Sequence, residues 1–470
     1  MHESDGQFSG NRGIVLNELR QIGGSICAPR GFRAGAVFCD IKRLGTGKGS
    51  EKGRKNDLAL IVSEFPAAVA GMFTTNQMRA APVRVSAKRA ARNFARAIVA
   101  NSGNANACTG ARGLRDAERM CAITAEALST AAISDRRTSR PMVRDRRYKI
   151  SAEDVLVCST GRIGISMPME NVKRGIKTCA RLVASSSESA QATANAIMTS
   201  DTHRKEIAVE FKIGKSVVRI GGVCKGAGMI EPKMTATGAL QATMLAFVTS
   251  DAAIAPPLFK RSLRIAVGQS FNCISVDGDM STNDAVIALA NGAAQNAKIT
   301  SGSSESFRDF QRALNFVTLA LAKMIVRDGE GATRFVTLRV NGARSSRDAE
   351  AVARAIAKSA LTKTSWHGGD PNWGRILCAI GYSTAAVDES RVSIGYSSPN
   401  QSKIVFGFRR GKPSGASILQ LARIVSGPEF DIHISLDNGS AGTIFYTSDL
   451  TEDYVSFNKG DMSDPESLGG

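Results

Sequence analysis

The sequence of 470 residues contains few of the side chains that bind metals or form disulfide frameworks. Its four histidines stand far apart, at positions 2, 203, 367 and 433, so no zinc-binding spacing is present. Nine cysteines are scattered without a CxxC pair, which indicates reduced thiols in a reducing compartment. We therefore predict no metal site and no bound cofactor.

The sequence also lacks any run of about 18 apolar residues, which argues against a membrane-spanning helix. Its first twenty residues have no apolar signal-peptide core, and Glu3 and Asp5 argue against a transit peptide. These absences predict a protein without a membrane partner. They favour the cytoplasm, with an organelle matrix as the less favoured location.

Acidic residues are outnumbered, since 61 lysines and arginines against 42 aspartates and glutamates give a net charge of +19. Two basic stretches, 42–57 and 135–149, lack interleaved aromatic residues and any known nucleic-acid motif. We interpret both as solvated loops and predict no nucleic-acid partner. The positive charge suits small anionic substrates.

The length predicts two or three structural units, and 43% apolar residues are enough for a large core. Apolar periodicity predicts an α/β (α+β layered) fold, with mixed sheets sandwiched by helices. We expect strands within 56–64, at the start of 96–113, within 153–159 and over 334–343. We expect helices over 114–131, 169–183 and 346–361, and a strand, an acidic loop and a helix over 271–293.

Two short motifs have the residues that acyl-transfer chemistry needs. Ser159-Thr160-Gly161 ends a strand, where a hydroxyl and an exposed backbone N–H could form an oxyanion hole. The alternative is an ordinary exit from a strand. Lys225 stands beside a Gly-x-Gly turn and could serve as a point charge for a small carboxylate, or be an exposed lysine next to a turn.

Two further turns are candidates. Glu330 lies between Gly329 and Gly331, where its carboxylate could bind an ammonium group or simply be solvated. The stretch 367–376, HGGDPNWGRI, could be functional, but a structural turn anchored by Trp373 explains it as well. None of these motifs decides the function alone.

Together the motifs resemble the ornithine acetyltransferase family, the bifunctional glutamate N-acetyltransferases of arginine biosynthesis. The resemblance extends over residues 21–463. It rests on APRGFRAGAV (28–37), FTTNQMRAAPV (73–83), NSGNANACTG (101–110), VLVCSTGRIG (155–164), KGAGMIEPKM (225–234), ATMLAFVTSDA (242–252), VDGDMSTNDAV (276–286), IVRDGEGATRFV (325–336), GGDPNWGRIL (368–377) and DLTEDYV (449–455).

The resemblance implies a self-cleaving enzyme. Its precursor cuts an Ala-Thr bond, and the α and β chains stay associated, in an α2β2 assembly. The new N-terminal threonine takes the acetyl group from N2-acetylornithine and passes it to glutamate, with its own α-amine as general base. Acetyl-CoA is an additional acetyl donor in bifunctional members, but no site for it can be read from the sequence.

The family's site residues match positions of this sequence one by one. Thr160 and Gly161 match the oxyanion pair, and three substrate-binding positions match Thr202, Lys225 and Glu330. Near the C-terminus, Asn458 matches a binding asparagine. Ser463 stands where the family has a threonine, so the hydroxyl is kept within a divergent tail.

The nucleophile has three candidates in EPKMTATGALQATMLAF (231–247). Thr243 stands eighteen positions after Lys225, seven more than in the family pattern, and TATGALQ (235–241) is the natural insertion. Cleavage at Ala242–Thr243 keeps everything downstream in register, giving chains 1–242 and 243–470, with a variable extension over 1–20 and a loose tail over 464–470.

Thr237 is the rival nucleophile, but it would place Gly238 inside the strand that follows the cut. Thr235 has no preceding alanine, and an uncleaved chain is the remaining alternative. Because the insertion loosens the tether of the scissile bond, we predict slow self-cleavage with transferase chemistry retained. Two other functions stay open: an aminopeptidase-like hydrolase with an N-terminal nucleophile, and a decayed, non-enzymatic relative.

Overall fold

A computed structural model describes residues 19–42, 55–134, 150–236, 244–399 and 401–459. Several predicted features lie outside these residues: the Ala242–Thr243 bond, the rival Thr237, Ser463, and most of the two basic loops. No helix of the described residues is long and apolar enough to cross a bilayer.

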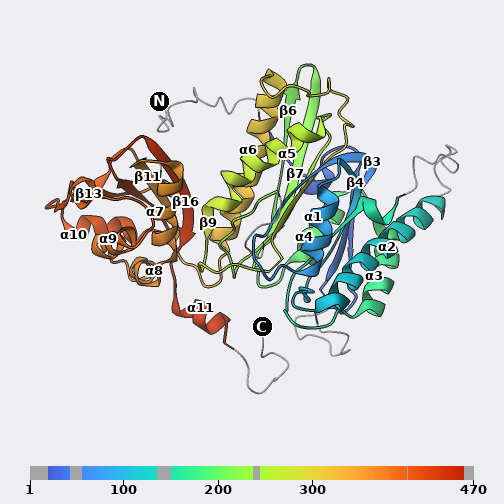
Figure 1. Ribbon diagram of the computed structural model, residues 1–470, viewed down its shortest axis with the longest axis horizontal. Coiled ribbons are helices and arrows are strands. Elements are labelled where there is room, and N and C mark those ends of the chain that lie inside the picture. The colour runs from blue at the N-terminus through green and yellow to red at the C-terminus, as the bar shows by residue number, and fades with distance from the viewer. Residues whose placement is uncertain (1–18, 43–54, 135–149, 237–243, 400, 460–470) are drawn as a thin grey trace.

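The larger of two sheets fills the right-hand part of the molecule (Figure 1) and has nine strands within the described residues. Its order is β1-β6-β7-β8-β10-β3-β4-β5, with β2 paired to β3. Its strands are β1 (Arg20–Ile22), β2 (Phe32–Val37), β3 (Leu58–Phe73), β4 (Phe94–Asn101), β5 (Val155–Ser159), β6 (Lys205–Ile213), β7 (Ser216–Lys225), β8 (Leu245–Ser250) and β10 (Ala285–Ala290).

Helices cover both faces of this sheet. They are α1 (Ala81–Ala90), α2 (Gly110–Ser134), α3 (Met169–Leu182), α4 (Ser187–Ile197), α5 (Pro256–Gly268) and α6 (Glu305–Arg327). Successive side chains of a strand point to opposite faces. In β10, Val286 and Ala288 accordingly join the core cluster of α5 and α6, whereas Ile287 and Leu289 join that of α4.

The second sheet forms the left-hand lobe in Figure 1 and carries its own core cluster with α7, α9 and α10. Its seven strands run in the order β14-β13-β12-β15-β11-β16-β9 within the described part of the chain. They are β9 (Ile274–Ser275), β11 (Phe335–Ala343), β12 (Ser393–Ser397), β13 (Val405–Arg409), β14 (Lys412–Pro413), β15 (Glu429–Ser435) and β16 (Ala441–Ser448). Its helices are α7 (Ser346–Lys358), α8 (Ala360–His367), α9 (Trp373–Gly381), α10 (Ile418–Val425) and α11 (Glu452–Phe457).

The predicted fold class, mixed α/β with helix-covered mixed sheets, is confirmed. One predicted element is wrong: the helix expected at the end of 271–293 is the strand β10. Its run AVIALA is buried at every position between β8 and β3, and a continuous apolar run suits a central strand buried on both faces. The helix predicted over 346–361 ends at Lys358, and Ser345 is its N-cap.

The start of the insertion is anchored away from β8. Thr235 and Phe73 of β3 exchange both backbone hydrogen bonds, at 3.0 and 3.2 Å. The sheet order from β7 runs through β8 and β10 to β3, so Thr235 lies four strand spacings from Lys225. At about 4.8 Å per spacing this is roughly 19 Å along the sheet. This separation keeps Thr235 out of the neighbourhood of Lys225.

Candidate active site

The pair Thr160 and Gly161 follows β5 directly and sits against the loop after β4. The φ of Gly161 is +126°, and a Cβ there would lie 2.4 Å from the carbonyl carbon of Gly103, so only glycine fits. The backbone N–H of Thr160 donates to the carbonyl of Asn101 at 3.0 Å. Thr160 can therefore offer its hydroxyl, rather than its backbone N–H, to a developing oxyanion.

Asparagines from two distant motifs hold this strand end in place. Nδ2 of Asn283 donates to the carbonyl of Ser159 at 2.8 Å and to that of Ala105 at 2.6 Å. Oγ of Ser159 donates to Oδ1 of Asn101 at 2.6 Å. Buried backbone carbonyls need such partners. The motifs at 101–110 and 276–286 thus meet at the candidate oxyanion site.

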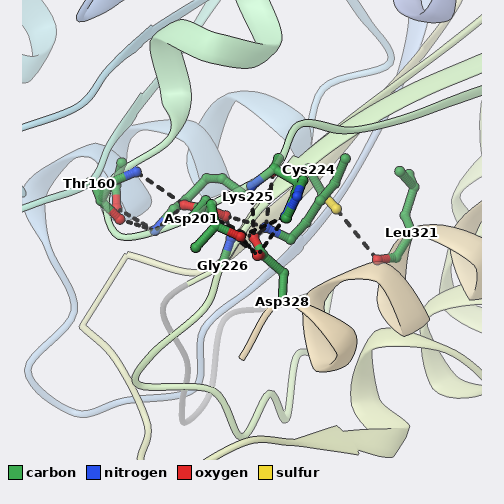
Figure 2. Close-up of polar contacts among 11 residues, drawn as sticks. Thr160, Asp201, Cys224, Lys225, Gly226, Leu321 and Asp328 are labelled. Atoms are coloured by element: carbon green, nitrogen blue, oxygen red, sulfur yellow. Dashed lines mark hydrogen bonds and ion pairs between the residues drawn. The ribbon is translucent and has the colours of Figure 1, made fainter. Parts of the chain in front are cut away.

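Lys225, the last residue of β7, points at the same place (Figure 2). Its Nζ donates to Oγ1 of Thr199 at 2.7 Å and lies 3.4 Å from Oγ1 of Thr160. The side chain is almost completely buried. Burial lowers the pKa of Lys225, and the carboxylate of Asp201 opposes that shift. A hydroxyl that accepts from Lys225 keeps its own proton free to donate elsewhere.

The strand that continues from the predicted nucleophile runs beside Lys225. In the sheet, Leu245 of β8 pairs with Lys225 on one side and with Ala285 on the other. Met244 follows Thr243 in the chain, and it is fully buried and accepts a hydrogen bond from the backbone N–H of Ala285 at 2.9 Å. Leu245, the first residue of β8, therefore lies in the row of laterally paired residues that also contains Lys225 and Ala285. This is the row of Lys225.

Asp284 was not predicted from the sequence. It precedes β10, is completely buried, and neither carboxyl oxygen has a hydrogen-bond partner among the described residues. Burial raises the pKa of Asp284 well above its usual range, against the opposing charge of Lys225. The carboxyl lies within electrostatic reach of the site, although its surroundings favour the neutral form.

Glu330 and Asn458 meet although 128 residues separate them in the chain. Nδ2 of Asn458, just after α11, donates to Oε2 of Glu330 at 2.9 Å. The backbone N–H of Glu330 donates to the carbonyl of Ala227, two residues after Lys225, at 2.9 Å. A Cβ on Gly228 would lie 2.5 Å from the Glu330 carboxylate. The glycines next to Lys225 thus let the Glu330 turn approach closely.

The partner of Thr202 is Asp328 and not Lys225. Its hydroxyl and backbone N–H both donate to Asp328, the backbone bond measuring 3.0 Å to Oδ2. Thr199, three residues earlier and not predicted from the sequence, contacts Lys225 in its place. The structure therefore groups Thr160, Gly161, Thr199 and Lys225, with the Glu330–Asn458 pair on the adjoining turn.

The family model for the ArgJ family matches residues 42–461 of this sequence. The chain belongs to the ArgJ family. An arginine biosynthesis bifunctional protein ArgJ of Symbiobacterium thermophilum is 41% identical over 440 residues, covering 94% of this chain and 99% of its own. Its counterpart in Geobacter sulfurreducens is 43% identical over 431 residues, covering 91% and 98%. The predicted family and the predicted acetyl transfer in arginine biosynthesis are confirmed.

Two solved structures are similar to parts of this ArgJ-family chain. The arginine biosynthesis bifunctional protein of Bacillus halodurans is 37% identical, with a TM-score of 0.43, covering 46% of this chain and 99% of its own. An ornithine acetyltransferase of Mycobacterium tuberculosis, solved with ornithine, is 33% identical, with a TM-score of 0.38, covering 46% of this chain and 100% of its own.

Family membership identifies an enzyme, so the non-enzymatic and hydrolase alternatives are not favoured. It does not assign roles to individual residues of this chain. The roles of Thr160, Gly161, Lys225, Glu330, Asn458 and Thr202 stay predictions, as do those of Ala242, Thr243 and Ser463.

Proposed function

We propose that this chain cuts itself at Ala242–Thr243 and then moves the acetyl group of N2-acetylornithine to glutamate through an ester on Thr243. The observation that supports it best is the contact of Lys225 with the hydroxyls of Thr160 and Thr199, in the sheet row where β8 begins. Met244, which follows Thr243 in the chain, directly precedes this row.

In the first half of the reaction, the Thr243 hydroxyl attacks the acetyl carbonyl carbon, and its proton passes to the threonine's own α-amine. A free α-amine has a pKa of about 7.7–8.0, so it can accept this proton near neutral pH. The hydroxyl of Thr160 and the backbone N–H of Gly161 stabilise the oxyanion. The C–N bond of the acetamide then breaks, the leaving α-amine of ornithine takes up the proton from the threonine amine, and ornithine leaves.

In the second half, the α-amine of glutamate attacks the acetyl-threonine ester. The proton lost by that amine returns to the Thr243 oxygen through the threonine amine, and N-acetylglutamate leaves. In both halves Lys225 binds the α-carboxylate of the substrate. In the first half Glu330, held by Asn458, binds the side-chain ammonium group of N2-acetylornithine. No bound cofactor takes part in this scheme.

We propose acetyl-CoA as a second acetyl donor, which would load the same threonine. We propose further that two αβ pairs associate, and exposed apolar side chains on α10 and α11, among them Leu419 and Val455, offer surface for this contact. The proposed compartment is the cytoplasm, which suits nine unpaired cysteines.

Incubation of the purified protein with N2-acetylornithine and glutamate tests the function. The expected products are ornithine and N-acetylglutamate, together with a fragment 243–470 that gains the mass of one acetyl group when glutamate is left out. Full-length chain without any transfer would contradict the proposal. Release of free acetate in place of N-acetylglutamate would favour a hydrolase.

A further inference from the structure

A buried lysine links the two halves of the candidate site. Lys205 begins β6, and its Nζ binds two carboxylates: Oδ1 of Asp201 at 2.6 Å and Oδ2 of Asp328. The side chains of Lys205 and Asp201 are at most 1% exposed, and that of Asp328 is 7% exposed. Figure 2 shows Asp201 and Asp328 converging beside Lys225 and Gly226.

Asp201, the first of the two carboxylates, positions the residues around Lys225. Oδ1 of Asp201 accepts the backbone N–H of Gly226 at 2.6 Å, and Oδ2 accepts that of Thr199 at 3.0 Å. Oδ2 also lies 3.9 Å from Nζ of Lys225. One carboxylate therefore fixes the residue after Lys225 in the chain and the threonine that accepts from it.

Asp328, the second carboxylate, positions the part of the candidate site that contains Glu330. Asp328 is the C-cap residue of α6 and stands two residues before Glu330. It accepts the hydroxyl and backbone N–H of Thr202, and the backbone N–H of His203 at 3.3 Å. Its position therefore sets where the turn that carries Glu330 leaves the helix.

Without a cation between them, two buried carboxylates would repel each other and lose part of their compensation for desolvation. The charges are consistent with such compensation. Despite burial, Asp201 and Asp328 raise the pKa of Lys205, and Lys205 contributes to lowering the pKa of both carboxyls. Lys205 itself contacts neither Thr160 nor Glu330 in any described interaction, so it would act through its two partners.

We propose that Lys205 is a positioning residue of the transfer reaction, which sets the distance between Lys225 and Glu330 by bridging Asp201 and Asp328. The inference rests on the proposed function, because it assigns substrate binding to Lys225 and Glu330. Its consequence is specific: loss of the bridge weakens binding of a substrate that spans both ends more than it slows the chemistry.

Steady-state kinetics of Lys205→Met and Lys205→Arg in the full chain test this inference. Lys205→Met is expected to raise the KM for N2-acetylornithine about tenfold or more, as loss of a charged contact does, with a smaller fall in kcat. Lys205→Arg keeps the charge and should recover most of the wild-type KM. Arg339→Met, which breaks a 2.7 Å ion pair with Asp431 in the second sheet, is the matched control and should leave KM unchanged.

A merely structural lysine would lower the amount of active enzyme, and hence kcat, with KM unchanged, and that result overturns the inference. If Lys205→Met does not fold, Asp328→Asn replaces it, and the same rise or absence of a rise in KM decides. A wild-type chain that transfers no acetyl group overturns the proposed function and this inference together. An active wild type together with a wild-type KM in Lys205→Met, or in Asp328→Asn where it replaces that variant, overturns the inference alone.

Discussion

Nδ2 of Asn458 donates a hydrogen bond to Oε2 of Glu330 over 2.9 Å, which ties the helix α11 to the turn after α6. The same amide group donates to the carbonyl of Tyr454 at 2.9 Å, so its orientation is fixed from its own helix. A carboxylate held in this way is oriented before a substrate ammonium arrives, and such preorganisation lowers the cost of binding.

Asn458→Ala is therefore expected to raise the KM for N2-acetylornithine about tenfold while kcat changes little, because one hydrogen bond to a charged group is lost. Steady-state kinetics with saturating glutamate measure it. Asn438→Ala is the matched control, since Asn438 donates to the carbonyl of Ala386 in the second lobe. An unchanged KM for Asn458→Ala would show that Glu330 does not bind the substrate through this arrangement.

Thr160→Ala should lower kcat by about 10² to 10³, as removal of one oxyanion donor does in other acyl-transfer enzymes. The reason is that Thr160 can offer only its hydroxyl, because the backbone N–H of Thr160 already donates to the carbonyl of Asn101. Thr160→Ser should retain most of the activity. Thr124→Ala, at a buried threonine of α2, controls for loss of a buried hydroxyl. Equal kcat values for Thr160→Ala and wild type would remove Thr160 from the oxyanion site.

Ionised Asp201 should stabilise the fold, and this stabilisation should be lost in acid. Although burial favours its neutral form, Lys225 and Lys205 lower the pKa of Asp201 to about 2, below the usual 3.8. A depressed pKa contributes stability above the unfolded pKa, and this contribution disappears as pH falls from about 4 to about 2. The loss amounts to about 2 kcal/mol.

Urea unfolding of wild type and Asp201→Asn measures this contribution. The wild type should be more stable at pH 7, and the difference between the two proteins should shrink below about pH 4. A difference that stays constant down to about pH 2.5 would mean that the carboxylate of Asp201 is not stabilised by its lysine neighbours.

Deletion of 235–241 should accelerate self-cleavage at least about tenfold, because a tighter tether holds the Ala242 carbonyl closer to the Thr243 hydroxyl. The deletion also removes Thr235, which is anchored to Phe73 on the far side of β10 from β8. The rate is followed as loss of full-length chain over time. A deletion variant that cuts no faster than wild type would show that the insertion does not limit the reaction.

Local motifs revealed much of the site. Thr160, Gly161, Lys225 and Glu330 each stand in a short stretch whose glycines and polar residues indicate a special turn, and the structure brings them near one another. The strand β10 was missed because its continuous apolar run has no period that separates a central strand from a buried helix.

Partners that are distant in sequence could not be predicted in this way. Lys205 binds Asp328 across 123 residues, and no local pattern marks either residue. The sequence does not identify Thr199, because the stretch Thr199–Thr202 offers two threonines. Only the fold decides which of the two contacts Lys225. The buried carboxyl of Asp284, which has no hydrogen-bond partner among the described residues, likewise becomes visible only when the strands on both sides are in place.

The central claim, that Thr243 is freed as a new N-terminus and acts as the nucleophile, is tested most directly by intact mass measurement and N-terminal sequencing of the smaller fragment. We expect a fragment that begins TMLAF, at Thr243. A fragment that begins TGALQ would move the nucleophile to Thr237, and a chain that stays uncut while it transfers acetyl groups would contradict the account altogether.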